Sequence, residues 1–432
     1  MKDSQTKKLM AIGTRTLIVG VDIAKKVHWA RFVDYRGIEQ TKALKFNNSI
    51  NGFKSLVEKV KKIKKEEKFT EIMVGMEPTG NYWKPFASFL TANEMEVVTV
   101  GTYQTKMAKA LDDNSPTKSD TKDALTIAKL VKDGRYSKVY MPEDIYAEMR
   151  VLSSLRGQLN DKMYTVKNRI HNILDEYFPE FTSIFKNPFT GKASVQILKS
   201  CPFPAQIIEL GVEGVLLEIK KAVKKTVGRK KAEELVNRAK SSIGVGYGTS
   251  AALLKLRMHM EEFELLTRQL SETEESMRKA LEATGFLETM LEIKGMGIVS
   301  AANIFGEVGD FRRFENERQI HRLAGYNLTE NSSGNNKSGT RISKRGRKRL
   351  RSVLFQSAMV MVTKNKEMKA FYEYLKGRKE NPLKRKQALI VVAKKIITII
   401  YKLVTKEVRY DSKLVFNKYR SEQISEIQEK AA

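Results

Sequence analysis

The first hundred residues alternate between apolar runs of strand length and amphipathic stretches of helical period. Residues 16–22 form a β-rich apolar run and residues 27–33 alternate apolar with polar positions, which predicts two paired strands joined near residues 24–26. The further predicted strands are residues 41–46, 71–77 and 96–101.

Helical spacing fills the intervals between these strands. Asn47 and Asn48 are candidate N-caps for a helix with apolar residues from Phe53 to Ile63, and a second helix is predicted to end near Asn93. Paired strands followed by strand–helix alternation predict an α/β domain with a mixed sheet.

After residue 116 the pattern becomes helical. An apolar stripe over residues 125–131 ends at Gly134. Residues 144–178 and 250–290 carry apolar positions at three- and four-residue steps and could pair as an antiparallel coiled coil, with a small helical insertion at 183–248 between them. The predicted domains are residues 1–143, 144–290 and 291–432.

Charge narrows the choice of partner. The chain carries 79 Lys and Arg against 50 Asp and Glu, a formal net charge of +29. Such an excess attracts polyanions, so nucleic acid is the first partner to expect and an anionic membrane surface the second; the alternative is a merely soluble basic protein. The single cysteine, Cys201, excludes an internal disulfide and a cysteine-based zinc site, and it favours a reducing compartment.

No segment is predicted to enter a membrane. The N-terminus begins with charges and Arg15 interrupts its apolar approach, which argues against a signal peptide. The longest apolar stretch, residues 388–404, is broken by Lys394 and Lys395. We therefore expect a soluble, cytoplasmic protein without a membrane partner.

Four acidic residues stand where strand ends and a helix start could meet. Asp22 follows the first apolar run, Glu77 ends a later strand, and Asp120 and Asp123 open the helix after residue 116. The i, i+3 spacing puts the last two on one helical face, about 5–6 Å apart. Clustered carboxylates repel one another, and two Mg²⁺ ions about 3.5–4 Å apart would relieve that repulsion and serve phosphoryl transfer. The structural alternative is that Asp120 and Asp123 only complement a helix dipole.

Residues 331–366 contain ten Lys or Arg and no acidic residue. Small, flexible residues precede a basic helix start, so Ser332 and Ser333 are expected on a loop beside strong phosphate binders. The plain alternative is a basic loop that grips phosphates while its serines take no part. The candidate nucleic-acid-binding side chains are Lys337, Arg341, Lys344, Arg345, Arg347, Lys348 and Arg349.

A glycine-rich turn precedes this segment. Gly295 and Gly297 are predicted to form a tight turn that leads into a helix N-terminus. Such a turn can present backbone N–H groups to a phosphate, as helix-hairpin-helix turns do. Packing of two helices against each other explains the same pattern.

The order of these motifs resembles that of the transposases of insertion-sequence family one-ten, the bridge-RNA-guided DEDD/serine recombinases. The resemblance covers about residues 15–180 and 285–375. The matching motifs are Gly20-Val-Asp22, Met76-Glu77-Pro-Thr-Gly80, Lys118-Ser-Asp120-Thr-Lys-Asp123-Ala, and Ser332-Ser-Gly334 followed by Ile342-Ser-Lys-Arg-Gly346.

The resemblance implies a RuvC-like, RNase H-like sheet domain, a long helical coiled-coil segment and a helical C-terminal domain. It also implies a serine that becomes covalently joined to DNA, best matched by Ser333, with Ser332 and Ser338 left open. The expected partners are donor and target DNA, a guide (bridge) RNA and further copies of the chain in a dimer or tetramer. The residues implied to bind divalent metal, as two Mg²⁺ or Mn²⁺ ions, are Asp22, Glu77, Asp120 and Asp123. The implied location is the prokaryotic cytosol, in association with the nucleoid.

Three functions can be told apart experimentally. The leading hypothesis is a recombinase that cuts and rejoins DNA through a phosphoserine link. The second is a RuvC-like junction nuclease that hydrolyses DNA with metal-activated water, which needs no serine and leaves no adduct. The third is a non-enzymatic nucleic-acid-binding protein, which would need none of the four acids.

Overall fold

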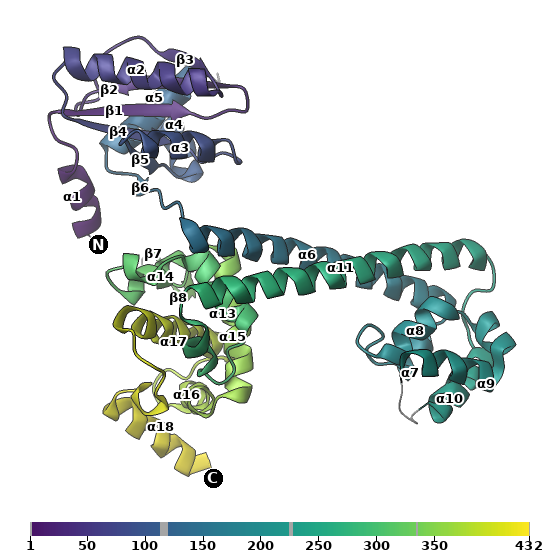
Figure 1. Ribbon diagram of the computed structural model, residues 1–432. Coiled ribbons are helices and arrows are strands. Elements are labelled where there is room, and N and C mark those ends of the chain that lie inside the picture. Colours follow the sequence, from purple (N-terminus) through teal and green to yellow (C-terminus); the bar gives the residue numbers. More distant parts are fainter. Residues whose placement is uncertain (1, 113–119, 224–227, 334–335, 432) are drawn as a thin grey trace. The chain divides into compact units, whose positions relative to one another are not determined.

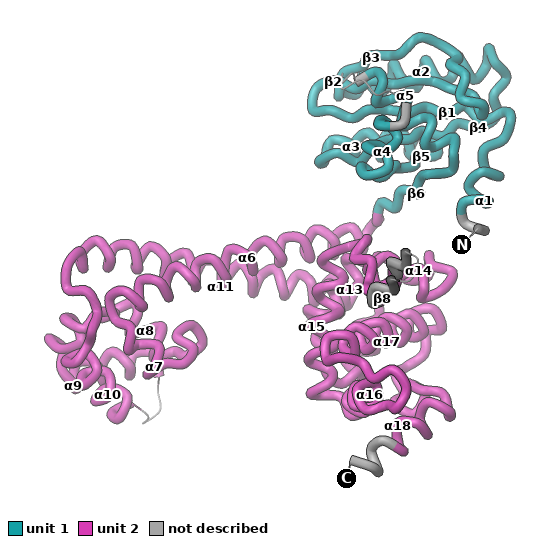
Figure 2. Tube along the Cα trace, turned by 180° about the vertical axis from the view of Figure 1, so that it is seen from behind, with its two compact units in different colours: residues 1–141 teal, residues 142–432 magenta. Residues whose placement is uncertain are grey.

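The computed structural model describes residues 2–112, 120–223, 228–333 and 336–431. The chain divides into two compact units, residues 1–141 and 142–432, which we call the N-terminal and the C-terminal unit (Figure 2). The predicted boundaries of three domains stay a prediction.

The N-terminal unit is built on a six-stranded sheet of order β3-β2-β1-β4-β5-β6 (Figure 1). β1 pairs antiparallel with β2 and parallel with β4, and β4 pairs parallel with β5. The predicted mixed sheet is therefore confirmed. The elements of this unit are α1 Lys2–Met10, β1 Thr16–Asp22, β2 Val27–Val33, β3 Leu44–Asn47, α2 Ile50–Glu66, β4 Glu71–Met76, α3 Trp83–Ala92, β5 Glu96–Thr99, α4 Thr102–Asp112, α5 Asp120–Lys132 and β6 Ser137–Lys138.

Alternation along β1 divides the core between the two faces of the sheet. Leu17, Val19 and Val21 pack with the apolar stripes of α2 and α3 on one face. Ile18 packs with Ile127 and other residues of α5 on the opposite face. The sheet is thus covered on both sides, which explains why β1 is buried along almost its whole length.

Two local details differ from the sequence-based expectation. The N-cap of α2 is Ser49, whose hydroxyl accepts a hydrogen bond from the amide of Gly52 at 3.2 Å, so the prediction of Asn47 or Asn48 as the cap is wrong. Asn48 instead donates through its side-chain amide to the carbonyl of Lys25 at 3.1 Å, which ties the β1–β2 connection to the start of α2. The helix α4 and the short strand β6 were not predicted.

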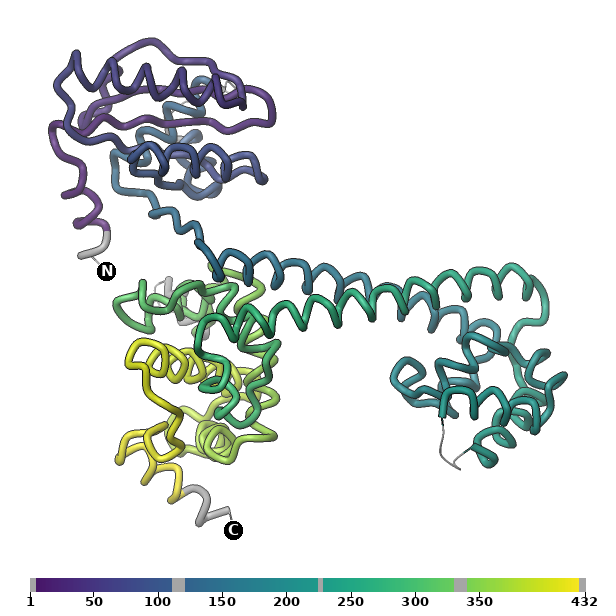
Figure 3. Tube along the Cα trace, in the orientation of Figure 1, coloured from purple at the N-terminus to yellow at the C-terminus, as the bar shows by residue number. Residues whose placement is uncertain are grey.

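Two long helices dominate the C-terminal unit. The helices α6 and α11 are 34 and 35 residues long, and they lie side by side in opposite directions (Figures 1 and 3). The predicted antiparallel pairing is confirmed, whereas its coiled-coil geometry stays a prediction. The elements of this unit are α6 Asp144–Tyr177, α7 Phe181–Ile184, α8 Lys192–Ser200, α9 Pro204–Ala222, α10 Arg229–Lys240, α11 Thr249–Ala283, α12 Leu287–Leu291, α13 Ile298–Val308, η1 Phe311–Arg313, α14 Glu317–Leu323, β7 Leu328–Ser333, β8 Asn336–Ile342, α15 Lys348–Lys364, α16 Lys366–Gly377, α17 Arg385–Lys406, η2 Ser412–Leu414 and α18 Lys418–Ala431.

The helical pair carries a separate core at each end. At one end, α7 to α10 form a small bundle with the last turns of α6 and the first turns of α11, and we call it the tip module. At the other end, Met149 of α6 and Met277 of α11 join the core formed by α12 to α17. Within the described residues, no helix combines the length and the apolar character that crossing a membrane requires.

Candidate active site and nucleic-acid interface

Two of the predicted acids lie at one edge of the N-terminal sheet. Asp22 is the last residue of β1, and Glu77 directly follows β4. Val21 and Met76 are partners in the parallel register of these strands, so the two acids continue the same ladder position. Neighbouring strands are about 4.8 Å apart, and both acids are half-buried.

Both acids also belong to the same face of the sheet. Side chains two residues apart along a strand point the same way, so Asp22 shares the face of Gly20 and Glu77 shares that of Gly75. Gly20 and Gly75 are direct partners in the register. A side chain at either position would point at α5, which lies on this face. The edge where Asp22 and Glu77 lie is therefore the edge covered by the start of α5.

The two paired glycines explain why α5 can lie so close to the sheet. A Cβ atom at Gly20 would overlap the carbonyl oxygen of Ala124 and lie 2.5 Å from the amide nitrogen of Ala128. A Cβ atom at Gly75 would overlap the side chain of Val131. This close approach brings the first turns of α5 directly over the strand that ends in an acid.

The third acid lies in that first part of α5. Asp123 is only 7% exposed, and its Oδ2 atom lies 2.6 Å from the Nζ atom of Lys109 on α4. Asp120 is the first residue of α5, and its side chain lies outside the described residues. The fold thus brings Asp22, Glu77 and Asp123 to one face at one edge.

A metal centre requires closer convergence than this. Among the side chains that the structure describes, no three carboxylate, imidazole or thiolate groups lie close enough to hold one ion. Carboxylate oxygens are nevertheless the ligands that Mg²⁺ and Mn²⁺ prefer. The donor types and their shared face fit a divalent cation, while the cation that contacts Asp123 here is the ammonium group of Lys109.

Lys109 and the glycine pair were missed at the level of sequence. The signal for the glycines is a repeated Gly-x-acid pattern, Gly20-Val-Asp22 and Gly75-Met-Glu77, at the ends of two strands. Lys109 gave no comparable signal, because the helix that carries it is weakly apolar and was not predicted.

The predicted serines lie on a hairpin rather than on a loop. β7 and β8 pair antiparallel, with Ser332 opposite Lys337 and Ser333 opposite Asn336. The expectation of a loop is wrong, because the backbone groups of these polar residues pair between the two strands. The side chains of Ser332, Ser333, Lys337 and Ser338 lie outside the described residues.

The basic residues that follow are not equivalent. Arg341, Lys344 and Arg345 are exposed. Arg347 is half-buried, and its Nη1 atom lies 3.4 Å from the carboxylate of Glu307, which is only 7% exposed. Arg347 is thus partly neutralised within the fold, which makes it a weaker candidate for binding phosphate than its exposed neighbours.

A buried tyrosine contacts the basic segment, by which we mean residues 331–366. Its hydroxyl, on Tyr326, donates to the backbone carbonyl of Arg351 in α15 at 3.2 Å. Burial raises the pKa of Tyr326 well above its ordinary value, so this hydroxyl stays a neutral donor. The contact ties the start of β7 to α15.

The predicted glycine turn is present, and its two glycines have different surroundings. Gly295 has a φ of +94°, and a Cβ atom there would lie 3.3 Å from Met361 and Lys364 of α15, so this glycine permits close packing. Gly297 is the N-cap of α13, and no described atom would lie within 4 Å of a Cβ atom there. Phosphate binding at this turn remains a prediction, and Gly297 is the residue with room for it.

Comparison with known families defines the class of protein. A family model described as a transposase, with DEDD and IS110 in its name, matches residues 19–179, which include all four acids. A second model, described as transposase of the IS116/IS110/IS902 family, matches residues 287–373, which include Ser333 and the basic segment. Together the two models cover more than half of the chain. The chain is therefore a transposase, which is a DNA-processing enzyme. It belongs to the IS110/IS116 family of insertion-sequence transposases.

Individual relatives agree with this placement. The 43.6 kDa protein of insertion element IS110 from Streptomyces coelicolor is 21% identical over 69% of this chain and 73% of its own length. The 44.8 kDa protein of insertion element IS116 from Streptomyces clavuligerus is 23% identical over 89% of this chain and 93% of its own. The transposase of insertion sequence element IS1111A from Coxiella burnetii is 30% identical over 34% of this chain and 41% of its own.

The family explains the architecture described above. The six-stranded mixed sheet is an RNase H-like DEDD domain, followed by long helices and a largely helical C-terminal region. The predicted fold class is confirmed.

Proposed function

We propose that this transposase cuts and rejoins DNA through a covalent serine–DNA intermediate, with a divalent-metal site formed by the four motif acids. The observation that carries the proposal is that Asp22 and Glu77 lie at the ends of neighbouring strands, on the face of the sheet that α5 covers with Asp123 in its first turn. A sheet that only needed a core would place apolar residues at these positions. Burying a carboxylate costs free energy, so acidic residues at these positions favour a role in the reaction over a role in packing.

The acids would hold the metal. Asp22, Glu77, Asp120 and Asp123 supply oxygen ligands, and one or two Mg²⁺ or Mn²⁺ ions among them would polarise the scissile phosphate and stabilise developing negative charge. The chain's own contribution is to fix the carboxylates on a rigid sheet edge. Lys109 neutralises Asp123 when no metal is bound, which reduces the repulsion among the acids.

The serine would supply the nucleophile. In the proposed step the Oγ atom of Ser333 forms a bond to phosphorus while the phosphodiester bond to one flanking oxygen breaks; the hydroxyl proton is lost and the leaving oxygen gains one. The exposed cations Arg341, Lys344 and Arg345 would balance the charge on the phosphate. The link conserves the bond energy that rejoining needs, which is the reason to use a serine in place of water.

Nucleic acid would also organise the reaction. The net charge of +29 supports binding of both DNA and a guide RNA, and the guide is proposed from the resemblance to bridge-RNA-guided recombinases. Exchange of paired strands calls for at least two active sites, so we propose that the chain acts as a homo-oligomer.

The test is the fate of the serine. Purified protein is incubated with end-labelled DNA that carries the element's termini, with its RNA and Mg²⁺, and is then denatured and resolved by size. We expect the unaltered protein and Ser332→Ala to give a labelled protein–DNA adduct, and Ser333→Ala to bind DNA but give none. An adduct that persists in Ser333→Ala would move the nucleophile to Ser332 or Ser338. Efficient cleavage without an adduct in the unaltered protein would replace the proposal by the metal-dependent junction nuclease.

A further inference from the structure

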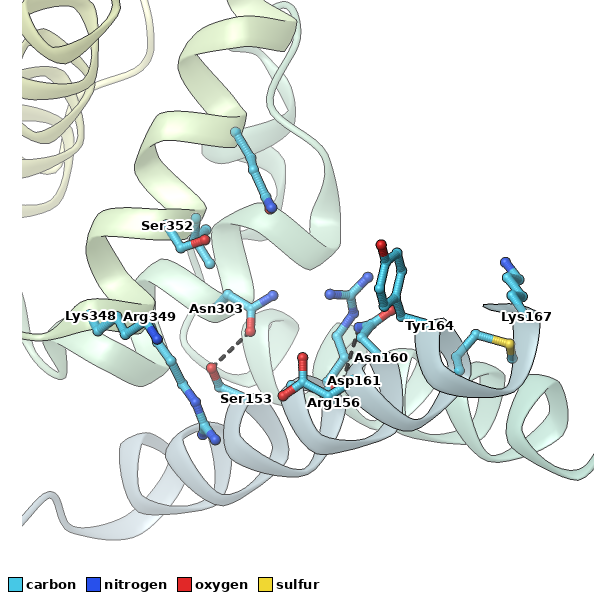
Figure 4. A pocket seen from close by; sticks show the side chains of 14 residues that line it. Ser153, Arg156, Asn160, Asp161, Tyr164, Lys167, Asn303, Lys348, Arg349 and Ser352 are labelled. Carbon is cyan, nitrogen blue, oxygen red and sulfur yellow. Dashed lines mark hydrogen bonds between the residues drawn. The ribbon is translucent and has the colours of Figure 1, made fainter. Parts of the chain in front are cut away.

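A polar groove of about 760 Å³ lies in the C-terminal unit between α6 and α15, with α13 at its floor (Figure 4). The residues of α6 that line it recur at three- and four-residue steps, so they form one face of that helix. The opposite wall is the first half of α15. We call this the α6–α15 groove. Its charged and aromatic lining residues are Arg156, Asp161, Tyr164, Lys167, Lys348 and Arg349.

The floor of the groove satisfies its own polar groups. The hydroxyl of Ser153 donates to Oδ1 of Asn303 at 2.8 Å, and the side-chain amide of Asn303 donates to the carbonyl of Val299 at 2.8 Å. Ser153 and Asn303 are almost fully buried. A ligand of the groove must therefore be recognised by the walls.

Two of the four cations on the walls already have partners within the protein. The Nε atom of Arg156 lies 2.8 Å from the carboxylate of Glu274 on α11. The ammonium group of Lys167 lies over the rings of Phe189 and Phe263, 5.6 and 5.7 Å from their centroids. These contacts fix Arg156 and Lys167 on the α6 wall. The cations left to bind a ligand are Lys348 and Arg349 of α15.

Lys348 and Arg349 are exposed and open the helix α15. Among the described residues, the ion pair at this turn is that of Arg347 with Glu307. Arg347 is the N-cap of α15 and makes no capping bond through its side chain, so the first-turn amides of α15 add to the positive potential. The guanidinium of Arg349 lies against α6 at Gly157, where a Cβ atom would be 3.5 Å from its Cζ. The absence of a side chain at Gly157 keeps the groove open where this charge lies.

An exposed aromatic ring lies further along the same wall. Tyr164 is 70% exposed, and Figure 4 shows its side chain projecting from α6 on the side that faces α15. It follows Gly157 by seven residues, which is roughly 10 Å along the helix axis. Cations at one position and an exposed ring about 10 Å away match a chain that alternates phosphates with flat bases.

We propose that the α6–α15 groove binds an unpaired strand of nucleic acid, with phosphates at Lys348 and Arg349 and a base stacked on Tyr164. The size of the groove supports this occupant, because its volume is that of a pocket for a drug-sized molecule and a duplex would not enter it. The inference rests on the proposed function, because that function supplies the nucleic-acid partner. What it adds is the place at which an unpaired segment of that partner is bound.

The experiment measures binding of fluorescent oligonucleotides to the full chain by anisotropy. The probes are a single-stranded oligo-dT, a single-stranded oligo-rU and a DNA duplex of equal length. The groove variants are Tyr164→Ala and Arg349→Gln. The matched controls are Tyr419→Ala, another tyrosine exposed to a similar degree, and Arg385→Gln, an exposed arginine at the first turn of α17.

Tyr164→Ala should weaken single-strand binding about tenfold, because stacking of a base on an aromatic ring contributes about 1–3 kcal/mol. Arg349→Gln should reduce the slope of log affinity against log salt by about 0.7, the value for one single-strand phosphate. Duplex binding by both variants should stay within twofold of the unaltered protein. A preference of the groove for oligo-rU over oligo-dT would assign it to RNA, the reverse preference to a DNA strand, and both support the proposal.

Single-strand affinities that match those of the controls would overturn the proposal. So would equal losses for single strand and duplex, which would show a general effect on charge or folding. Failure here is distinct from failure of the serine chemistry. If the unaltered protein forms the adduct but Tyr164→Ala binds single strands normally, the groove proposal alone is refuted. If Tyr164→Ala loses tenfold in single-strand affinity but the unaltered protein forms no adduct, the serine chemistry alone is refuted.

Discussion

In the proposed reaction the acid-bearing sheet edge and the basic segment act on the same substrate, yet the protein builds them in opposite ways. Asp22, Glu77 and Asp123 are half-buried or buried, and a helix packed against two glycines fixes their positions. Arg341 lies exposed on β8, and Lys344 and Arg345 lie exposed just after this strand. Metal chemistry depends on sub-ångström placement, whereas phosphate binding adds up contributions from many charges. Substitutions should therefore act almost all-or-none at the first site and by small increments at the second.

The largest effect is expected at the acids. Asp22→Asn or Asp123→Asn should lower DNA cleavage at least about 1,000-fold, since each removes a charged metal ligand, while DNA binding stays within about twofold. Removing Mg²⁺ with a chelator should have the same effect. The measurement is cleavage of labelled DNA alongside binding by anisotropy. Asp133→Asn, whose carboxylate pairs with Lys132 just after α5, is the control. Full cleavage by both variants, or in excess chelator, contradicts a shared metal site.

The next effect tests the scaffold that positions the acids. Gly20→Ala forces a methyl group into the backbone of α5 and should lower the free energy of unfolding by about 3 kcal/mol or more. Gly13→Ala, where the new Cβ would be 3.8 Å from Thr16, should change it little. Urea unfolding followed by circular dichroism gives both values. Equal stability of the two variants would mean that α5 does not need the glycine.

A smaller effect is expected in the core of the C-terminal unit. Lys395 is half-buried, and its ammonium group lies 4.7 Å from the centre of the Phe416 ring. Burial, with help from Lys402 and Arg420, lowers its pKa to about 8. The unfolded chain binds this proton up to a pH near 10.5, so the cost is complete below pH 8 and disappears as the pH rises to 10.5. Lys395→Met should therefore raise the free energy of unfolding at pH 7 by about 1–3 kcal/mol, and by less at pH 10.

The control for this prediction is Lys394→Met, one residue earlier on α17. The comparison needs urea unfolding midpoints of both variants at pH 7 and pH 10. A stabilisation by Lys395→Met that does not shrink at pH 10 would trace the effect to packing and not to charge.

The smallest effect separates two neighbouring arginines. Arg345→Gln should reduce the salt slope of DNA binding by about 0.9, the value for one phosphate, and weaken binding a fewfold. Arg347→Gln should reduce it less, because Glu307 already neutralises Arg347. Replacing both should flatten the slope further. Unchanged slopes in all three variants would show that this run is only a solvated surface.

Sequence alone predicted the parts of the fold whose residues carry their own periodicity. The apolar run of β1 and the alternation of β2 predicted both strands to the residue, and the apolar stripe of α2 predicted that helix but not its cap. The hairpin at Ser333 was missed, because its polar residues become strands only through pairing across residue 334. The helix α4 was missed because it is weakly apolar, and Lys109 was missed with it.

The candidate site was predicted in part for the same reason. Asp22 and Glu77 could be placed from strand ends, since parallel strands end at a common edge. The α6–α15 groove could not, because Tyr164 and Arg349 are separated by most of the C-terminal unit in sequence and line one groove only because α13 packs against both of their helices. Contacts of this kind follow from tertiary structure and leave no local pattern.

The length of the paired helices α6 and α11 sets the distance between the two cores of the C-terminal unit. With 34 and 35 residues at a rise of 1.5 Å each, the two helices are roughly 50 Å long, and the tip module packs on one end while the core around Met149 packs on the other. Removing seven residues from each helix would shorten that span by roughly 10 Å and turn the tip module by only about 20°, whereas removing five would also swing it to another side. The length of this strut is thus a dimension that evolution can adjust in steps of two helical turns, without redesigning either end.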